Sequence, residues 1–598
     1  MSRITTDSED LERVRQLLEA ALKRKYPQSA PERVPLDPAT DKRFADFATG
    51  VAFPLAKKER KPPNVIAEEI VAEINVELSA MPAFRPATSV KGFINITATP
   101  LFWQNVVAEI LRVGPDYGRG AASGKRVSLE FGSANPTGPL LVVQGRSLAI
   151  GSTLASAMRF AGDDVVTDWI VNDTGSQMQT LARSLYARWR KIADPGFPFP
   201  EDGYPGEYLV AIAQRFDAEL TRDEREELAR APIEHVLARF ERYGRDAILE
   251  GQKETCRRFG TWFYFQSERI FHEAGLVDAV IELLVEEGYT VREGDAIALR
   301  PDLDPEDEKA RILRRSDGRP TYFGADIIYH FAKYRHATEA IDVLGPDHHG
   351  YLPRVRAMAE LWRRLRTTPG LQRLLDRLDA LGLEGATEWA GSDVSVDVLI
   401  AQQVSLVRGG EKMSMSKRAG LILTLDEILD EVGVDAARFF FIMLAPESPL
   451  TFDVELAVKQ SNDNPVYYVQ YGHARIASLI AHARSNPATA EYVEAAQHGE
   501  HLDRLSHATE VALARRLSEW PRVVAQAARD LAPHRLPTYA REVAGDFHQF
   551  YTECTVVDRD NPETSIARLA LAMATRSVLA SALGICGVSA PDSMERRS

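Results

Sequence analysis

The chain has 598 residues, of which 45% are hydrophobic and 26% charged, and its formal net charge is −14 at pH 7. This length predicts roughly three to five domains, and the composition is typical of a soluble globular protein. An acidic chain is not an indiscriminate nucleic-acid binder, although a local basic face is enough for an RNA partner. The cysteines Cys256, Cys554 and Cys586 are far apart, which argues against a disulfide framework or a zinc site.

No apolar run approaches the roughly 18 residues that a membrane span needs, and residues 1–10 are too polar for a signal peptide. Residues 1–115 are expected to form a small α/β module. Apolar spacing predicts helices over residues 11–25 and 65–78, and residues 91–97 alternate like a strand. Composition alone favours a module that serves only packing.

Residues 126–171 are predicted to form a strand, a loop, a helix and a second strand. Residues 127–131 and 165–171 are the apolar strands, and residues 145–160 have helical spacing. The loop at 133–139 contains two prolines and a glycine, which exclude regular structure. Such a unit opens a nucleotide-binding parallel sheet, in which phosphates meet free N–H groups at helix N-termini.

Residues 180–300 are charged and are expected to be helical, as an insertion into the sheet domain. The sheet is expected to resume at 321–329 and 341–344 and to continue at 404–407, while residues 371–391 have no assigned role. From about residue 455 the pattern is that of an all-α bundle. The predicted fold is therefore a Rossmann-type α/β domain (120–450) between a small α/β domain (1–115) and a helical bundle (455–598).

The loop at 133–146 reads Ser-Ala-Asn-Pro-Thr-Gly-Pro-Leu-Leu-Val-Val-Gln-Gly-Arg. It resembles the first signature of arginyl-tRNA synthetases, class I enzymes that activate arginine with ATP. In that family this frame is usually followed by His-x-Gly-His, but here the four positions are Leu141, Val142, Val143 and Gln144. The family's histidines donate hydrogen bonds to the ATP phosphates, and its glycine admits adenine. Their replacement predicts ATP activation slowed on the order of 10³-fold or more.

Residues 409–420 read Gly-Gly-Glu-Lys-Met-Ser-Met-Ser-Lys-Arg-Ala-Gly and resemble the family's mobile Lys-Met-Ser-Lys loop. Spacing from both flanks aligns that word with residues 414–417, which keeps only the second lysine, Lys417. The other alignment uses Lys412 as the first lysine. Thr424 and Glu427 are expected to form a capping box for the next helix.

The resemblance implies a set of ATP-site residues, and residues 345–351 resemble the family's segment beside adenosine. A metal site at its two histidines is the weaker alternative, since no further ligands follow with suitable spacing. The implied catalytic residues are Gln144, Lys412 and Lys417, and the implied ATP-binding residues are Gly138, Leu141, Val143, Gly145, Gly345, Asp347, His348, Met415 and Ser416.

Arginine requires carboxylates that match its planar guanidinium. Glu130, Asn135, Tyr322 and Asp326 match the family's arginine-binding residues in type, spacing and order. Taken singly, each acid is as well explained as a surface or salt-bridge residue. Taken together, they favour an arginine site.

Residues 463–475 resemble the start of the family's anticodon-binding domain, and residues 46–58 and 92–95 resemble its N-terminal domain, which contacts the outer corner of tRNA. Unpaired bases are read by stacking on aromatic side chains and by polar groups. The resemblance therefore implies tRNA contacts at Tyr468, Gln470, Tyr471 and Arg475. The alternative is that about half of these aromatic residues are helix core.

Three functions remain open from the sequence. The first is an arginine–tRNA ligase that uses ATP with Mg²⁺, has arginine and its tRNA as partners, and is a cytoplasmic monomer without a membrane partner. The second is a catalytically impaired paralogue that binds arginine or tRNA as a sensor or regulator. The third and weakest is another nucleotidyl transfer, in which Val143 reshapes the base site.

Overall fold

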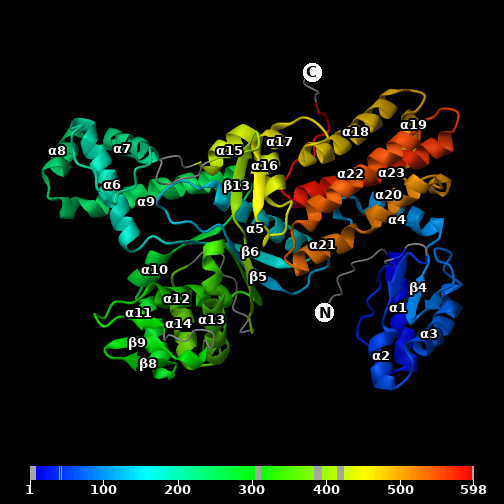
Figure 1. Ribbon diagram of the computed structural model, residues 1–598, viewed down its shortest axis with the longest axis horizontal. Helices are drawn as coiled ribbons and strands as arrows, with labels where there is room; N and C mark the ends of the chain where they lie inside the picture. Colours follow the sequence, from blue (N-terminus) through cyan, green and yellow to red (C-terminus); the bar gives the residue numbers. More distant parts are fainter. Residues whose placement is uncertain are drawn as a thin grey trace.

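A five-stranded parallel sheet lies at the centre of the protein (Figure 1). The structure is a computed structural model that describes residues 9–39, 41, 44–303, 311–382, 393–413 and 423–594. The strands are β5 (Arg126–Phe131), β6 (Asp164–Val171), β7 (Tyr264–Ser267), β11 (Glu339–Leu344) and β12 (Ser395–Ile400). Their order is β12-β11-β5-β6-β7, with every neighbouring pair parallel. Because the order reverses between β5 and β11, ligands are expected beyond the carboxyl ends of these two strands.

The predicted strand–loop–helix–strand unit is confirmed. Helix α5 (Val142–Phe160) connects β5 to β6 and is buried along nearly its whole length, since its residues are mostly apolar or small. Gly151 allows the helix to touch the sheet, because a Cβ at this position would lie 2.0 Å from the Phe131 ring. The helix N-terminus is therefore held firmly at the carboxyl edge of β5.

Two segments that were predicted to be strands of this sheet lie elsewhere. Residues 321–329 begin a helix, α12 (Tyr322–Tyr334), in which Phe323, Ile327 and Phe331 bury one face at four-residue spacing. A short run of apolar and aromatic residues is consistent with a strand or with a helix. Here these three buried residues are four positions apart, which is the spacing of a helix. Residues 404–407 lie in β13 (Val404–Arg408), which belongs to a separate sheet.

The separate sheet has the order β14-β13-β15, with β14 (Glu411–Lys412) and β15 (Leu450–Asp453). The short helices α15 (Leu425–Val432) and α16 (Val434–Phe441) lie between β14 and β15 in the chain, and α17 (Val454–Val458) follows β15. The capping box predicted for α15 is confirmed. The Glu427 N–H donates to Thr424 Oγ1 at 3.2 Å, and the Thr424 N–H donates to Glu427 Oε2 at 2.7 Å.

Two lobes extend from the central sheet (Figure 1). The first, α6 (Ser176–Ala193), α7 (Tyr208–Glu219), α8 (Arg222–Arg230) and α9 (Ile233–Arg258), has a core of its own in which Trp189, Phe216 and Phe240 touch. The expectation of an all-helical insertion over residues 180–300 is wrong beyond residue 258, because β7 and the second lobe begin there. Elements of the second lobe are α10 (Glu268–Glu273), α11 (Leu276–Glu286), β8 (Thr290–Glu293), β9 (Ala296–Leu299), β10 (Ile312–Arg314), α12, α13 (Leu352–Leu365) and α14 (Pro369–Asp379).

The N-terminal module combines helices with a four-stranded antiparallel sheet of order β1-β2-β4-β3. Its helix α4 also packs against α20 and α23, so this helix bridges the module and the C-terminal bundle. The elements are α1 (Glu9–Lys25), β1 (Asp37–Pro38), β2 (Phe47–Thr49), α2 (Ala52–Glu59), α3 (Pro63–Leu78), β3 (Thr88–Val90), β4 (Phe93–Ile96) and α4 (Pro100–Val113).

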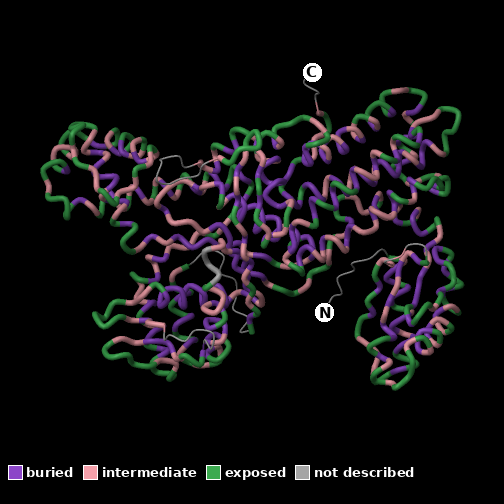
Figure 2. Tube along the Cα trace, viewed as in Figure 1, coloured by how far each residue is buried: buried purple, intermediate pink, exposed green. Residues whose placement is uncertain are grey.

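The C-terminal part is an all-α bundle, as the sequence predicts, and its buried positions face one another across the helices (Figure 2). Its helices are α18 (Pro465–Ser485), α19 (Ala490–Gln497), α20 (Ala508–Ser518), α21 (Trp520–Arg529), α22 (Arg535–Glu553) and α23 (Pro562–Ile585). Contrary to the expectation from the sequence, α23 is long and apolar enough to span a membrane, but 67% of its apolar window is buried. It packs against α18, α19, α22 and α4, and is thus the core helix of the bundle.

A buried arginine joins the parallel-sheet domain to the bundle. Arg438 donates to the carbonyl of Cys586 at 2.9 Å, to the carbonyl of Phe259 at 2.7 Å and to Ser152 Oγ at 2.8 Å. Burial lowers the pKa of Arg438 to about 10. Gly587 leaves room for the guanidinium, since a Cβ there would lie 2.3 Å from Arg438 Nε. These contacts fix the bundle relative to helix α5 and the central sheet.

Candidate active site

Three carboxylates form a row across adjacent strands near the carboxyl edge of the sheet. Asp342 of β11 is in register with Glu130 of β5, which is in register with Asp168 of β6. All three are buried. Lys333, on helix α12, donates to Glu130 Oε2 at 2.8 Å and to Asp342 Oδ1 at 2.5 Å. This row of Asp342, Glu130 and Asp168, called the carboxylate row, is held together by a buried ammonium.

The charges in the row are set by burial and by Lys333. Burial alone would raise the pKa of Asp342, but the Lys333 ammonium and His330 hold it well below its ordinary value. Burial likewise opposes the charge of Lys333, yet Asp342 and Glu130 raise its pKa above the ordinary value. Burial raises the pKa of Asp168 to about 6, although Ser128 donates to it at 2.6 Å and the charge of Lys333 opposes the rise. Asp342 and Lys333 therefore form a buried ion pair.

Asp326 is a buried carboxylate with an unused oxygen. It lies one helical turn after Tyr322 at the start of α12, so both side chains share a face. Asp326 is 6% exposed, and among the described residues its Oδ2 has no hydrogen-bond partner. Burial raises the pKa of Asp326 to about 7, and Glu268 adds to this while His330 and Tyr351 oppose it. An unpaired buried acceptor of this kind fits a cationic ligand.

The predicted arginine-binding residues come together at this place. Tyr322 is 53% exposed as a residue, but desolvation of its hydroxyl raises the pKa of that group, and the charges of Asp326, Glu268 and Glu130 raise it further. Asn172 hydrogen-bonds to the Tyr322 side chain and donates from Nδ2 to Asn135 Oδ1 at 3.1 Å. Glu130, Tyr322, Asp326 and Glu268, with the neighbouring amides, are called the acidic site.

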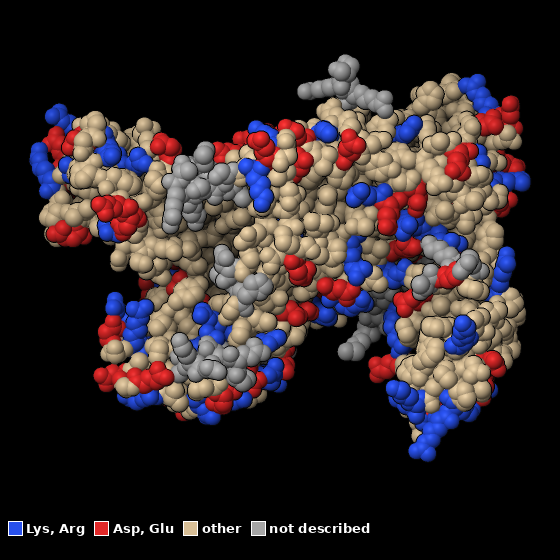
Figure 3. Space-filling model, viewed as in Figure 1, with Lys and Arg blue, Asp and Glu red and all other residues tan. Residues whose placement is uncertain are grey.

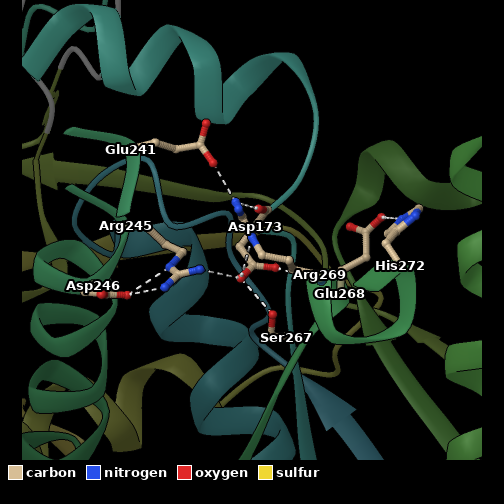
Figure 4. Close-up of polar contacts among 8 residues, drawn as sticks. All are labelled: Asp173, Glu241, Arg245, Asp246, Ser267, Glu268, Arg269 and His272. Atoms are coloured by element: carbon tan, nitrogen blue, oxygen red, sulfur yellow. Dashed lines mark hydrogen bonds and ion pairs between the residues drawn. The ribbon is translucent and has the colours of Figure 1, made fainter. Parts of the chain in front are cut away.

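Sequence reasoning missed Glu268. It follows β7 directly as the first residue of α10 and is 6% exposed, with His272 Nε2 at 3.4 Å from its Oε1 (Figure 4). A carboxylate directly after a parallel strand is a usable signal, because strand ends meet at the ligand edge of the sheet. The signal was lost because β7 lies inside the segment that was expected to be helical.

Another buried acid, Asp173, fixes the ends of β6 and β7. Asp173 accepts from Ser267 Oγ at 2.7 Å, from the Arg269 N–H at 3.0 Å and from Arg245 Nη1 at 3.3 Å (Figure 4). Arg269 in turn pairs with Glu241 at 2.6 Å. These bonds tie α9 of the first lobe to α10 of the second and so hold Glu268 in place.

The first signature loop is shaped by the residues that replace the family's histidines. Gln144 folds back, and its Oε1 accepts the Leu141 N–H at 2.9 Å as a helix cap. Its amide nitrogen keeps two donors at the N-terminus of α5, where the first N–H groups have no partner within the helix. Val143 is 41% exposed beside this terminus. The N-terminus of α5 thus has the donors that a phosphate needs, and the branched apolar side chain of Val143 lies next to it.

The two signature segments are joined by backbone. Leu141 pairs with Thr424 in an isolated antiparallel bridge, and the Leu425 N–H donates to the Leu140 carbonyl at 2.8 Å. The N-termini of α5 and α15 therefore lie side by side. The positive ends of both helix dipoles therefore lie in the same region, which suits the binding of a polyphosphate.

Two glycines of the predicted ATP site have different surroundings. Gly138 lies in the loop, where its carbonyl accepts from Gln252 Nε2 at 2.8 Å. Gly145 faces the core instead, because a Cβ there would lie 2.7 Å from Leu425 and 3.0 Å from Phe441. Gly145 thus serves the packing of α5, and its contact with ATP stays a prediction.

The remaining predicted ATP-site residues are less completely described. Gly345 follows β11 directly at the switch point, with open space around its α-carbon. Lys412 is exposed on β14, opposite Val407. Met415, Ser416 and Lys417 lie outside the described residues, as do the side chains of Asp347 and His348.

The predicted tRNA residues on α18 separate into two groups. Tyr468, Tyr471 and Arg475 are half-buried; Tyr468 lies 4.9 Å from the His548 ring and lines an open groove of about 460 Å³ beside α22. Gln470 is buried, and its amide donates to Asp435 at 2.8 Å and to the Ser589 carbonyl at 3.0 Å. Gln470 therefore holds the bundle to α16 and is not available to a base in this arrangement, contrary to the prediction.

Comparisons with known proteins agree with this architecture. The arginyl-tRNA synthetase N-terminal domain model matches residues 12–98, and the DALR anticodon-binding domain model matches residues 469–594. The chain is 38% identical to the arginine–tRNA ligase of Syntrophotalea carbinolica, over 98% of this chain and 100% of that protein. It is 37% identical to the arginine–tRNA ligase of Thermotoga maritima, over 97% and 99%.

Among solved structures, the arginyl-tRNA synthetase of Thermus thermophilus is similar with a TM-score of 0.69 and 23% identity, over 98% of this chain and 100% of that one. This likeness shows the same fold: a small α/β module, a parallel-sheet domain with lobes, and a helical bundle. The full-length sequence similarity decides the relationship. The chain belongs to the arginyl-tRNA synthetase family.

Proposed function

We propose that the protein is an arginine–tRNA ligase. Arginine and ATP form an arginyl-adenylate with release of pyrophosphate, and the arginyl group then passes to the 3′ end of its tRNA. The observation that carries this proposal is the acidic site, in which Asp326 Oδ2 has no hydrogen-bond partner among the residues that the structure describes. Full-length similarity to arginine–tRNA ligases supports it and favours it over a sensor or regulator.

Arginine lies in the acidic site. Asp326 and Glu268 accept hydrogen bonds from the guanidinium, whose fixed fork of donors suits buried carboxylates better than a lysine ammonium would. Glu130, Asn135 and Tyr322 line the same site. The site carries more acids than bases, so a cation gains from entering it while a neutral analogue does not.

ATP binds at the N-termini of α5 and α15 beside the acidic site. The first-turn N–H groups of α5 and the Gln144 amide nitrogen donate to the phosphates, and Lys412 and Lys417 add positive charge from the second signature segment. Mg²⁺ arrives with ATP and neutralises part of the phosphate charge. Leu141 and Val143 supply no donor, so the site stabilises developing charge less well than the family's histidines do.

The tRNA contacts two distant parts of the protein. Tyr468, Tyr471 and Arg475 on α18 offer stacking and positive charge to unpaired bases. The N-terminal module adds an exposed pair of rings, Phe53 and Phe93, with centroids 4.9 Å apart. Exposed basic residues follow on α2 and after it, where Lys and Arg gather at the end of the module (Figure 3): Lys57, Lys58, Arg60 and Lys61. The protein acts as a cytoplasmic monomer without a membrane partner.

Arginine-dependent pyrophosphate exchange in the presence of tRNA tests this proposal. A ligase gives exchange that requires arginine, ATP and tRNA together. If exchange is absent while tRNA and arginine still bind, the protein is the impaired paralogue suggested by Leu141 and Val143. If ATP fails to bind and another nucleotide binds, the third function is correct.

A further inference from the structure

Both oxygens of the Glu130 carboxylate accept hydrogen bonds, and Oε2 accepts two of them. Lys333 Nζ and the Tyr329 hydroxyl both donate to Oε2, at 2.8 and 2.9 Å. Oε1 accepts from Ser133 Oγ at 3.0 Å, and Ser133 belongs to the first signature loop. The carboxylate is therefore fixed by α12 through Oε2 and contacts the first signature loop through Oε1.

Lys333 provides the fixed positive charge for this arrangement. Its side chain is 0% exposed, and its ammonium lies 5.3 Å from the centre of the Tyr329 ring. Without it, Glu130 and Asp342 would be neighbouring carboxylates in one register row, and like charges in a buried place repel or become protonated. Either change would turn or neutralise the Glu130 carboxylate.

We propose that Lys333 is a positioning residue for the amino acid: it holds Glu130 by Oε2 so that the carboxylate is presented to arginine in one fixed orientation. Lys333 itself does not touch the substrate. The inference rests on the proposed function, because it concerns how the acidic site recognises arginine. Lys333 thereby links the recognition of arginine to the packing of α12 against the sheet.

Lys333→Met tests this inference in the full-length protein, with KM for arginine and KM for ATP measured separately by pyrophosphate exchange. We expect KM for arginine to rise about tenfold or more, since a charge-assisted contact is worth roughly that factor, while KM for ATP stays within about twofold. Lys125→Met is the matched control. Lys125 pairs with Glu339 at 3.1 Å at the opposite end of the same sheet and should leave both constants unchanged.

A second variant separates positioning from folding. Lys333→Met/Asp342→Asn removes one base and one acid, so the net buried charge equals that of the wild type and thermal stability should recover from the loss in Lys333→Met. We expect KM for arginine to stay raised, because Glu130 still lacks its ammonium. Recovery of both stability and KM would overturn the inference, as would an unchanged KM in folded Lys333→Met. Absence of exchange in the wild type would instead contradict the proposed function.

Discussion

The two sides of the proposed site, one for arginine and one for ATP, are built in different ways. On the arginine side, strands β11, β5 and β6 and helix α12 bring buried acids together and leave one oxygen of Asp326 unpaired. On the proposed ATP side, the N-terminus of α5 is in place, but Leu141 and Val143 occupy the positions at which the resemblance predicts a donor and a glycine. In the proposed site, recognition of the amino acid and activation by ATP therefore depend on separate parts of one sheet edge, so one can change while the other is kept.

The largest expected effect comes from removing the unpaired acceptor. Asp326→Asn replaces the carboxylate by an amide that cannot pair with a guanidinium charge. We expect kcat/KM for arginine to fall about 10²–10³-fold, because loss of a buried charge partner costs several kcal/mol. Steady-state exchange kinetics measure this. Asp317→Asn, in an exposed turn, is the control. A fall of less than about threefold would show that Asp326 does not face the substrate.

The next effect concerns the ATP side. Leu141→His/Val143→Gly/Gln144→His restores the family's donors and its glycine, and we expect the exchange rate to rise about 10²-fold or more, as preorganised donors are worth that much. KM for arginine should change little. Leu141→Ala/Val143→Gly/Gln144→Ala is the control, since it opens space without adding donors. No gain over this control would mean that the altered loop does not limit activation.

A smaller effect is the pH dependence of arginine recognition. Burial raises the pKa of Asp326 to about 7, so in the free protein this carboxyl is protonated at lower pH. A guanidinium favours the ionised form, and arginine binding must therefore expel a proton below that pH. We expect KM for arginine to rise up to about tenfold per pH unit below pH 7, and KM for ATP to lack this dependence. A pH-independent KM for arginine between pH 5.5 and 7.5 would contradict the assignment.

The smallest effect concerns the loop that separates the two sides. Gln252 Nε2 donates to the carbonyls of Asn135 and Gly138, at 3.1 and 2.8 Å. Gln252→Met keeps the length of the side chain but loses both bonds. We expect kcat/KM to fall about five- to tenfold for both substrates, in line with one or two net hydrogen bonds. A loss confined to arginine would show that the loop belongs to the acidic site alone.

Much of this arrangement is predictable from residue patterns, and the exceptions have physical reasons. Period and turn residues identify the βαβ unit and the capping box of Thr424 and Glu427, since both are local. The helix α12 was missed because its apolar run is too short to separate strand from helix by composition. Glu268 and Lys333 were missed because their roles depend on the tertiary fold. The order of the strands brings residues that are distant in sequence together at the carboxyl edge of the sheet.

The packing role of Gly145 has the same origin. Its position in the signature predicts a nucleotide contact, whereas Leu425 and Phe441, nearly three hundred residues later, occupy the space beside its α-carbon. Gln470 is a similar case. Its sequence position predicts a contact with a base, but its amide donates instead to Asp435 and to the Ser589 carbonyl. Long-range packing of this kind leaves no local pattern.

The most direct test of the central claim is calorimetric titration of arginine into the protein without ATP, in buffers of different ionisation enthalpy near pH 6.5. If the arginine side is complete by itself, arginine binds at one site per chain and releases protons, and Asp326→Asn abolishes both signals. If arginine binds only when ATP is present, or binds without proton release, the two sides are not independent and the account is wrong.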